Sequence, residues 1–196
     1  MAVDLIVSAL SKYWSGDYIT PVMEAAWNLG ADYKVALPTG IKSIPRGSLY
    51  GGEGAGEERK DLAAFVERIM EALLLEGGSR AWNERSDHFG FYRVDPRSFG
   101  ELVKRAGSQF TKKTGLIGRL RGKRDSFSHL ASAPIFMPAK FESPLDLEGK
   151  VFGSLVAARE ELSSGDWSGI SQEEIRPIIQ AFEEAASQNL PLIVDL

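Results

Sequence analysis

The sequence predicts an α/β or α+β fold, a single layered domain over residues 1–196 with about five short strands alternating with about five helices. Two patterns predict this class. Short apolar runs rich in β-branched residues have the length of buried strands, and longer segments repeat apolar residues at helical spacing. The chain is also 43% hydrophobic and 26% charged, a composition that can supply one sizeable core.

The strongest helical pattern lies in residues 57–76, where apolar side chains recur at the i, i+3, i+4 spacing of one helix face. Acidic residues begin the segment, where the helix dipole favours negative charge, and Gly77 and Gly78 follow it as a stop. We expect this helix to be the main core helix. Its predicted inner face is Leu62, Phe65, Val66, Ile69, Met70, Leu73 and Leu74.

The other helices and the strands follow from the same patterns and from capping signals. Thr20-Pro21 and Asp95-Pro96 each combine an N-cap residue with proline at the first helical position, and Ser171 with Glu174 forms a capping box. Pro177 should kink the last helix or shift its start. The expected helices are 20–30, 95–110, 151–165 and 171–186, and the expected strands are 3–9, 33–37, 89–94, 133–137 and 192–194.

Three segments are expected to be irregular. Residues 11–18 are predicted to form an aromatic-rich turn, and residues 38–56, with two prolines and six glycines, a long loop. Residues 111–130 are basic and interrupted by glycine. We expect the segments near 38–56 and 111–130 to be mobile loops.

Composition excludes several classes of protein. The chain has no cysteine, which excludes disulfides, thiolate metal ligands and cysteine nucleophiles. Its N-terminus carries an early Asp4 and no basic region, unlike a signal peptide, and no apolar run approaches the roughly 18 residues of a membrane span. These features predict a cytoplasmic protein without membrane contact, and no segment calls for a cofactor.

Charge is distributed unevenly along the chain. Residues 100–130 carry eight Lys and Arg against two acids, whereas residues 131–196 carry four against eleven. Segregation of this kind bears on partners and association rather than on fold. The acidic part predicts a surface that attracts a basic protein, with aromatic anchors in the N-terminal quarter. The predicted protein-binding residues are Glu160, Glu161, Glu173, Glu174, Glu183, Glu184, Trp14, Tyr18 and Tyr50.

An enzyme or nucleotide-binding protein is the first alternative. The glycine loop Gly51–Gly56 runs into the main helix, where backbone N–H groups could hold a phosphate, although Glu53 would repel one. Glu84, Asp87 and His88 lie together in the sequence and offer carboxylates and an imidazole for general acid–base catalysis. The spacing of these residues predicts no metal site.

Nucleic-acid binding through the basic segment 104–124 is the second alternative. Its candidate anion-binding residues are Arg119, Arg121, Lys123 and Arg124. The aromatic residues flank these cations rather than interleaving with them as base-stacking platforms would, and the rest of the chain is acidic. Both features argue against a nucleic-acid partner.

The leading hypothesis is therefore a non-enzymatic, soluble protein-binding domain. Its concrete form is a bacterial toxin-neutralising immunity or antitoxin protein that captures a basic toxin by electrostatically steered protein–protein contact. The oligomeric state and the partner's identity stay open at this level.

Overall fold

The computed structural model describes residues 2–15, 21–31, 33–37, 40–44, 55–75, 82–112, 125–147 and 149–195. Its helices are α1 (Leu10–Ser15), α2 (Pro21–Asn28), α3 (Ala55–Leu75), α4 (Pro96–Phe110), α6 (His129–Ser132), α7 (Leu155–Ser164) and α8 (Gln172–Gln188). Its strands are β1 (Val3–Val7), β2 (Tyr33–Leu37), β3 (Gly40–Ile44), β4 (Gly90–Val94), β5 (Ile135–Met137), β6 (Leu145–Leu147), β7 (Lys150–Ser154) and β8 (Leu192–Asp195).

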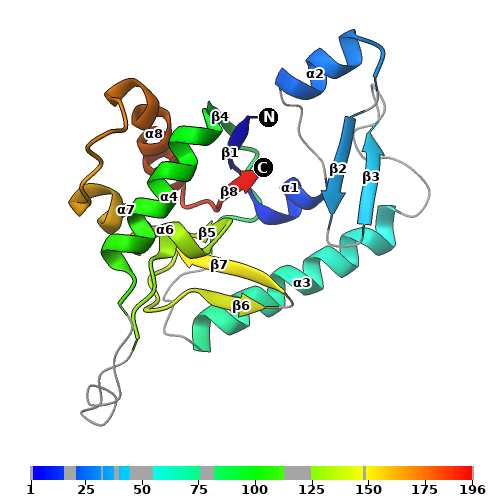
Figure 1. The fold of residues 1–196 in the computed structure, drawn as a ribbon. Coiled ribbons are helices and arrows are strands. Elements are labelled where there is room, and N and C mark those ends of the chain that lie inside the picture. The colour runs from blue at the N-terminus through cyan, green and yellow to red at the C-terminus, as the bar shows by residue number, and fades with distance from the viewer. Residues whose placement is uncertain are drawn as a thin grey trace.

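A mixed six-stranded sheet in the order β4-β1-β8-β5-β7-β6 forms the centre of the molecule (Figure 1). β5 and β7 are parallel, whereas the other neighbouring pairs are antiparallel. β2 and β3 form a separate antiparallel pair, which stands beside α2 and away from the main sheet. Helices and strands are thus mixed along a layered α and β domain, and the predicted fold class is confirmed.

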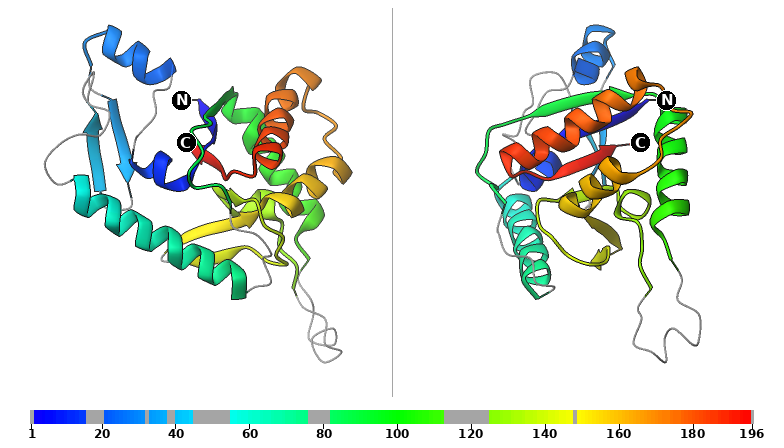
Figure 2. Two further views of the ribbon diagram at one scale, coloured as in Figure 1. Left: turned by 180° about the vertical axis from the view of Figure 1, so that it is seen from behind. Right: turned by 90° about the vertical axis from the view of Figure 1, so that its left-hand side faces the viewer.

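The central strands bury both of their faces. Along β1, Leu5 points into one apolar cluster and Ile6 into another, as the two-residue period of a strand requires. The first cluster packs against α4, α6, α7 and α8, and the second against α1, α2 and α3. Figure 2 shows α3 and the α8 side of the molecule on opposite faces of the sheet. The sheet therefore carries two cores, one on each face.

The main helix predicted at 57–76 is α3, and most of its predicted inner face is confirmed. Leu62, Phe65, Val66, Ile69 and Leu73 are buried, and the ring of Trp14 on α1 lies 4.9 Å from that of Phe65. Leu74 is instead 62% exposed, which corrects its predicted place on the inner face. Leu74 follows Leu73 by one residue, so it is turned about 100° around the helix axis and leaves the contact.

Capping signals located the helix starts correctly. The Asp95 side chain accepts hydrogen bonds from the backbone N–H groups of Arg97 and Ser98 at the start of α4. The capping box of Ser171 and Glu174 is complete at the start of α8. Pro177 lies inside α8 and does not shift its start, because the capping box fixes that start five residues earlier.

All three segments that were expected to be irregular contain some regular structure. Part of the expected turn 11–18 belongs to helix α1, β3 lies within the expected loop 38–56, and α6 begins within the expected loop 111–130. The start of α1 is capped from a distant part of the chain by Glu84, which local sequence does not reveal. Residues 38–39 and 45–54 of the first expected loop and residues 113–124 of the second lie outside the described residues.

The helix expected at 151–165 is also corrected. Residues up to Ser154 form β7, and the helix begins only at Leu155. β7 pairs with β5 on one side and with β6, which the sequence pattern did not predict, on the other. Val151 and Phe152 carry side chains that fit a strand, and pairing on both sides decides in favour of one. In the described part of the chain, no helix is long and apolar enough to cross a bilayer.

Candidate functional site

A surface groove of about 380 Å³ lies between α7 and α8, which pack against each other. In the right-hand view of Figure 2, α8 crosses in front of the sheet with α7 below it. Residues from both helices line the groove: Val156, Arg159, Glu160, Leu162, Ser163, Ile179, Phe182 and Glu183. Its volume is at the lower end of the range for small-molecule pockets, about 300–1,000 Å³, and is enough for a few side chains of a partner.

The floor of the groove is apolar and rests on the first core. Phe182 is 1% exposed and its ring lies 4.9 Å from that of Phe136, edge to face, while Leu162 is 8% exposed. Val156 and Ile179 are half-buried and line the same space. The groove therefore offers apolar surface that the fold itself leaves partly in contact with water.

Charged side chains form its walls. Glu160 comes from α7 and Glu183 from α8, and both are exposed, as is Arg159 beside Glu160. Lys140 pairs with Glu160 at 3.5 Å in an exposed ion pair. Among the described residues, no cation pairs with Glu183. Two of the predicted protein-binding residues, one from each helix, thus line the same groove.

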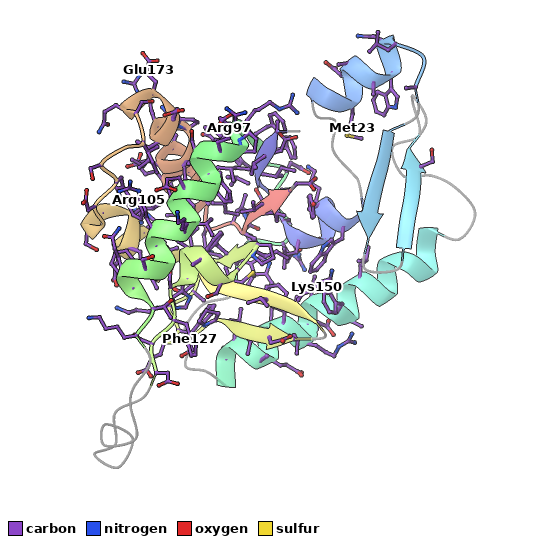
Figure 3. All side chains as sticks on the ribbon, in the orientation of Figure 1. Met23, Arg97, Arg105, Phe127, Lys150 and Glu173 are labelled. Carbon is purple, nitrogen blue, oxygen red and sulfur yellow. The ribbon has the colours of Figure 1, made fainter. Side chains whose placement is uncertain are left out.

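The turn between the two helices is held firmly. The Trp167 indole N–H donates to the Leu162 carbonyl at 2.7 Å. Gln109 on α4 donates to the Asp166 carbonyl at 3.1 Å and accepts from the Asp166 N–H at 2.8 Å. Figure 3 places Arg105 on the side of α4 that faces this turn. Hydrogen bonds from Ser168 lower the pKa of Asp166, so this carboxylate stays charged at neutral pH.

Glu173 and Glu174 lie at the start of α8, beyond the groove. The Ser98 hydroxyl donates to Glu174 at 2.7 Å, and the Ser171 N–H donates to it at 2.9 Å. These hydrogen bonds, first those from Ser171, lower the pKa of Glu174. Glu173 points away from the body of the molecule in Figure 3. Glu174 therefore joins the starts of two helices, while Glu173 remains at the surface.

Glu161 is the predicted interface residue that lies inside the protein. It is 8% exposed and accepts hydrogen bonds from the Ser128 hydroxyl and from the backbone N–H groups of His129 and Leu130. Its carboxylate therefore caps α6. The outward position expected from helix periodicity is corrected, because orphan N–H groups of another helix attract this side chain inward.

Glu184 also serves the fold. Its carboxylate lies 2.9 Å from Nε2 of His88 and rests over Gly90, where a Cβ atom would collide with it. Burial and then the neighbouring Glu184 carboxylate raise the pKa of Tyr92 to about 12. Glu184, which was predicted for protein binding, thus contacts His88, which was predicted for catalysis, and this contact links α8 to the segment just before β4.

The three residues of the alternative catalytic hypothesis each contact different residues. Glu84 accepts hydrogen bonds from the N–H groups of Leu10 and Ser11 and from the indole of Trp82. Asp87 is exposed and pairs with Lys12 at 3.4 Å. His88 contacts Glu184 instead. The side chains of Glu84, Asp87 and His88 are not brought to one point.

Several predicted residues contribute no surface or lie outside the described residues. Trp14 is 2% exposed and belongs to the second core, which corrects its expected role as a surface anchor. Predicted residues outside the described residues are Tyr18, Tyr50, Arg119, Arg121, Lys123 and Arg124, as are residues 51–54 of the glycine loop. Within the described part of the chain, no group of three His, Asp or Glu could hold a metal ion.

Sequence reasoning missed the apolar half of the groove. Val156, Ile179 and Phe182 look like ordinary inner-face residues of two helices, and periodicity alone cannot tell which of them stay accessible. The sequence does hold one signal: on each helix these apolar residues lie within four positions of Glu160 or Glu183. No family model, no curated protein and no solved structure matches this chain.

Proposed function

We propose that this protein is a non-enzymatic binding domain that captures a basic protein through the surface formed by α7 and α8. The observation that carries the proposal is the pair Glu160 and Glu183, one from each helix, in the lining of a partly apolar groove. Interfaces commonly combine an apolar centre with a polar rim, and a fixed acidic rim steers a basic partner toward that centre.

The charge of this region supports the same function. Residues 155–188 carry seven Asp and Glu against two Lys and Arg. Glu161 is internal, and Glu173 with Glu183 remains at the surface. Exposed charges act over about one Debye length, roughly 8–10 Å at 0.1–0.15 M salt, so Glu183 acts on a protein that approaches the groove. Glu173 lies about 15 Å away along the axis of α8 and adds to the long-range attraction only at low salt.

A toxin-neutralising immunity or antitoxin protein is the specific form of this proposal. Such a protein needs a rigid surface that binds its toxin rapidly, and the hydrogen bonds of Gln109 and Trp167 hold the α7–α8 turn in place before binding. A toxin that acts on nucleic acid would present the basic surface that these acids complement.

Co-expression with neighbouring genes tests the function. The chain should relieve growth arrest caused by one neighbouring gene product, and the two purified proteins should form a complex. The double charge reversal Glu160→Lys and Glu183→Lys should lower the association rate constant at low salt by roughly ten-fold. Added salt should reduce this difference, because it screens the attraction.

Glu67 and Glu71 on α3 provide the matched control. Both are exposed, and α3 packs on the opposite face of the sheet. Reversing these two charges changes net charge by the same amount and should leave most of the association rate in place. The proposal fails if no neighbouring product forms a complex, or if the two double variants lose association rate equally.

A further inference from the structure

We infer that the occupant of the α7–α8 groove is an amphipathic helix of the partner that carries Lys or Arg beside a stripe of apolar side chains. This inference rests on the proposed function, because it names the structural form of the segment that the acidic surface would capture. The occupant is thus a helix of another protein and not an extended segment, a small molecule or a second copy of this chain.

The groove is lined by two helices, and this favours a third helix as its occupant. On α7 the lining is Val156, Arg159, Glu160, Leu162 and Ser163, all of which except Leu162 follow the i, i+3, i+4, i+7 spacing of one helix face. On α8 it includes Ile179, Phe182 and Glu183 at i, i+3 and i+4. A groove bordered by two such helix faces presents ridges that interdigitate with those of a third helix.

The apolar floor of the groove requires that one face of the partner helix be apolar. Ile179 and Val156 are half-buried above the fully buried ring of Phe182, so apolar side chains of the partner would complete a layer that already rests on the core. With a volume of about 380 Å³, the groove holds a few such side chains and not a large segment. Leu, Ile or Phe at helical spacing fits this space.

The charged residues of the groove determine which residues we expect on either side of the apolar stripe of the partner helix. Glu160 and Glu183 stand on different helices, so cations are needed on both sides of the apolar stripe. Lys140 at 3.5 Å from Glu160 is an internal example of such a contact, and it is exposed enough for a partner's cation to replace it. Arg159 adds one positive charge on the α7 side, where an acidic residue of the partner would be tolerated.

A synthetic helical peptide tests the inference on the full chain. The probe is an Ala-rich peptide of roughly 18 residues, long enough to form a helix, with Leu at i, i+4 and i+7 and Lys on both flanks. One comparison peptide replaces each Lys by Glu, and another carries a central proline that breaks the helix. Binding is followed by amide chemical shifts of the protein, which report both affinity and location.

The basic helix should shift the amides of Val156, Ser163, Ile179 and Glu183 in a saturable way. Both comparison peptides should bind at least ten-fold more weakly. Ser163→Phe places a ring in the groove from an exposed position and should weaken binding at least ten-fold. Ser187→Phe makes the same change at an exposed position of α8 outside the groove lining and should leave the affinity within two-fold.

Other outcomes would overturn the inference. Equal binding of the proline peptide would indicate an extended occupant, and equal binding of the Glu-flanked peptide would remove the charge argument. Groove shifts that depend on protein concentration alone would indicate a second copy. If a protein partner is found whose affinity ignores Ser163→Phe, the proposed function stands and this inference fails. If the peptide binds but no partner exists, the function fails and the groove's preference stands.

Discussion

The carboxylate of Glu161 on α7 accepts a hydrogen bond from the backbone N–H of His129 at 2.8 Å and so caps α6 from inside the protein. The Ser128 hydroxyl and the Leu130 N–H donate to the same carboxylate at 2.7 and 3.1 Å. Glu161→Ala should lower the free energy of unfolding by about 3 kcal/mol, because it leaves buried donors without an acceptor. Urea unfolding measures this loss.

Glu160→Ala is the control for this prediction. Glu160 is the preceding residue of the same helix, is exposed, and forms a surface ion pair with Lys140. Its removal should change the free energy of unfolding by no more than about 1 kcal/mol. Equal losses in the two variants would show that the inward position of Glu161 contributes nothing.

His129 should make stability depend on pH. It is 3% exposed, and its Nδ1 accepts a hydrogen bond from the Ser154 N–H at 2.9 Å. Burial lowers the pKa of His129 below its ordinary value of 6.5, although the charge of Glu161 acts in the opposite direction. The unfolded chain therefore binds a proton near pH 6.5 that the folded chain does not, so stability should fall as the pH drops below about 6.5.

The variant His129→Gln tests the source of this dependence. The free energy of unfolding of the wild type should rise with pH between about 5.5 and 6.5, with a slope of up to roughly 1.4 kcal/mol per pH unit. Most of that slope should disappear in the variant. Nuclear magnetic resonance of the imidazole should also show His129 neutral below pH 6.5, and a protonated His129 at pH 6.5 would contradict the prediction.

Tyr92 should make stability depend on pH in the alkaline range. Its pKa is raised to about 12, first by burial and then by the neighbouring Glu184 carboxylate. A group whose pKa is raised in the folded state favours folding below its unfolded value of about 10 and loses that contribution as the pH rises toward 12. Stability should therefore decline above pH 10, and Tyr92→Phe should reduce the decline.

Glu184→Gln gives the matching measurement for the same site. It removes the negative charge beside the Tyr92 hydroxyl while keeping a side chain of similar size over Gly90. The pKa of Tyr92, followed by the ultraviolet absorbance of tyrosinate, should fall in this variant. An unchanged pKa would assign the whole shift to burial.

Glu84 should behave as a structural residue. Its carboxylate accepts from the N–H groups of Leu10 and Ser11 at 2.9 and 3.1 Å and from the Ser11 hydroxyl at 2.6 Å. Glu84→Ala should lower the free energy of unfolding by about 2 kcal/mol and alter the fluorescence of Trp82, which also donates to Glu84. The exposed neighbour Asp87, changed to Ala, should cost less than about 1 kcal/mol. Equal losses of the free energy of unfolding in Glu84→Ala and Asp87→Ala would contradict the structural role of Glu84.

Local sequence predicted the features that depend on neighbouring residues. The apolar spacing of α3, the Asp95-Pro96 start of α4 and the capping box at Ser171 each arise within a few residues, and each was located correctly. The helix prediction for the run from Val151 to Leu155 was wrong because the apolar residues of this run fit the pattern of both a helix and a strand. Pairing with β5 and β6, which are apart in the sequence, chose the strand up to Ser154.

The class of fold, the main helices and the excess of acid in the last third of the chain follow from the order of the residues alone. The roles of those acids depend on packing: Glu161 turns inward to cap α6, Glu184 contacts His88, and Glu183 lines the groove. Periodicity fixes only the face of a helix on which a residue lies. The donors that attract a carboxylate are supplied by other elements.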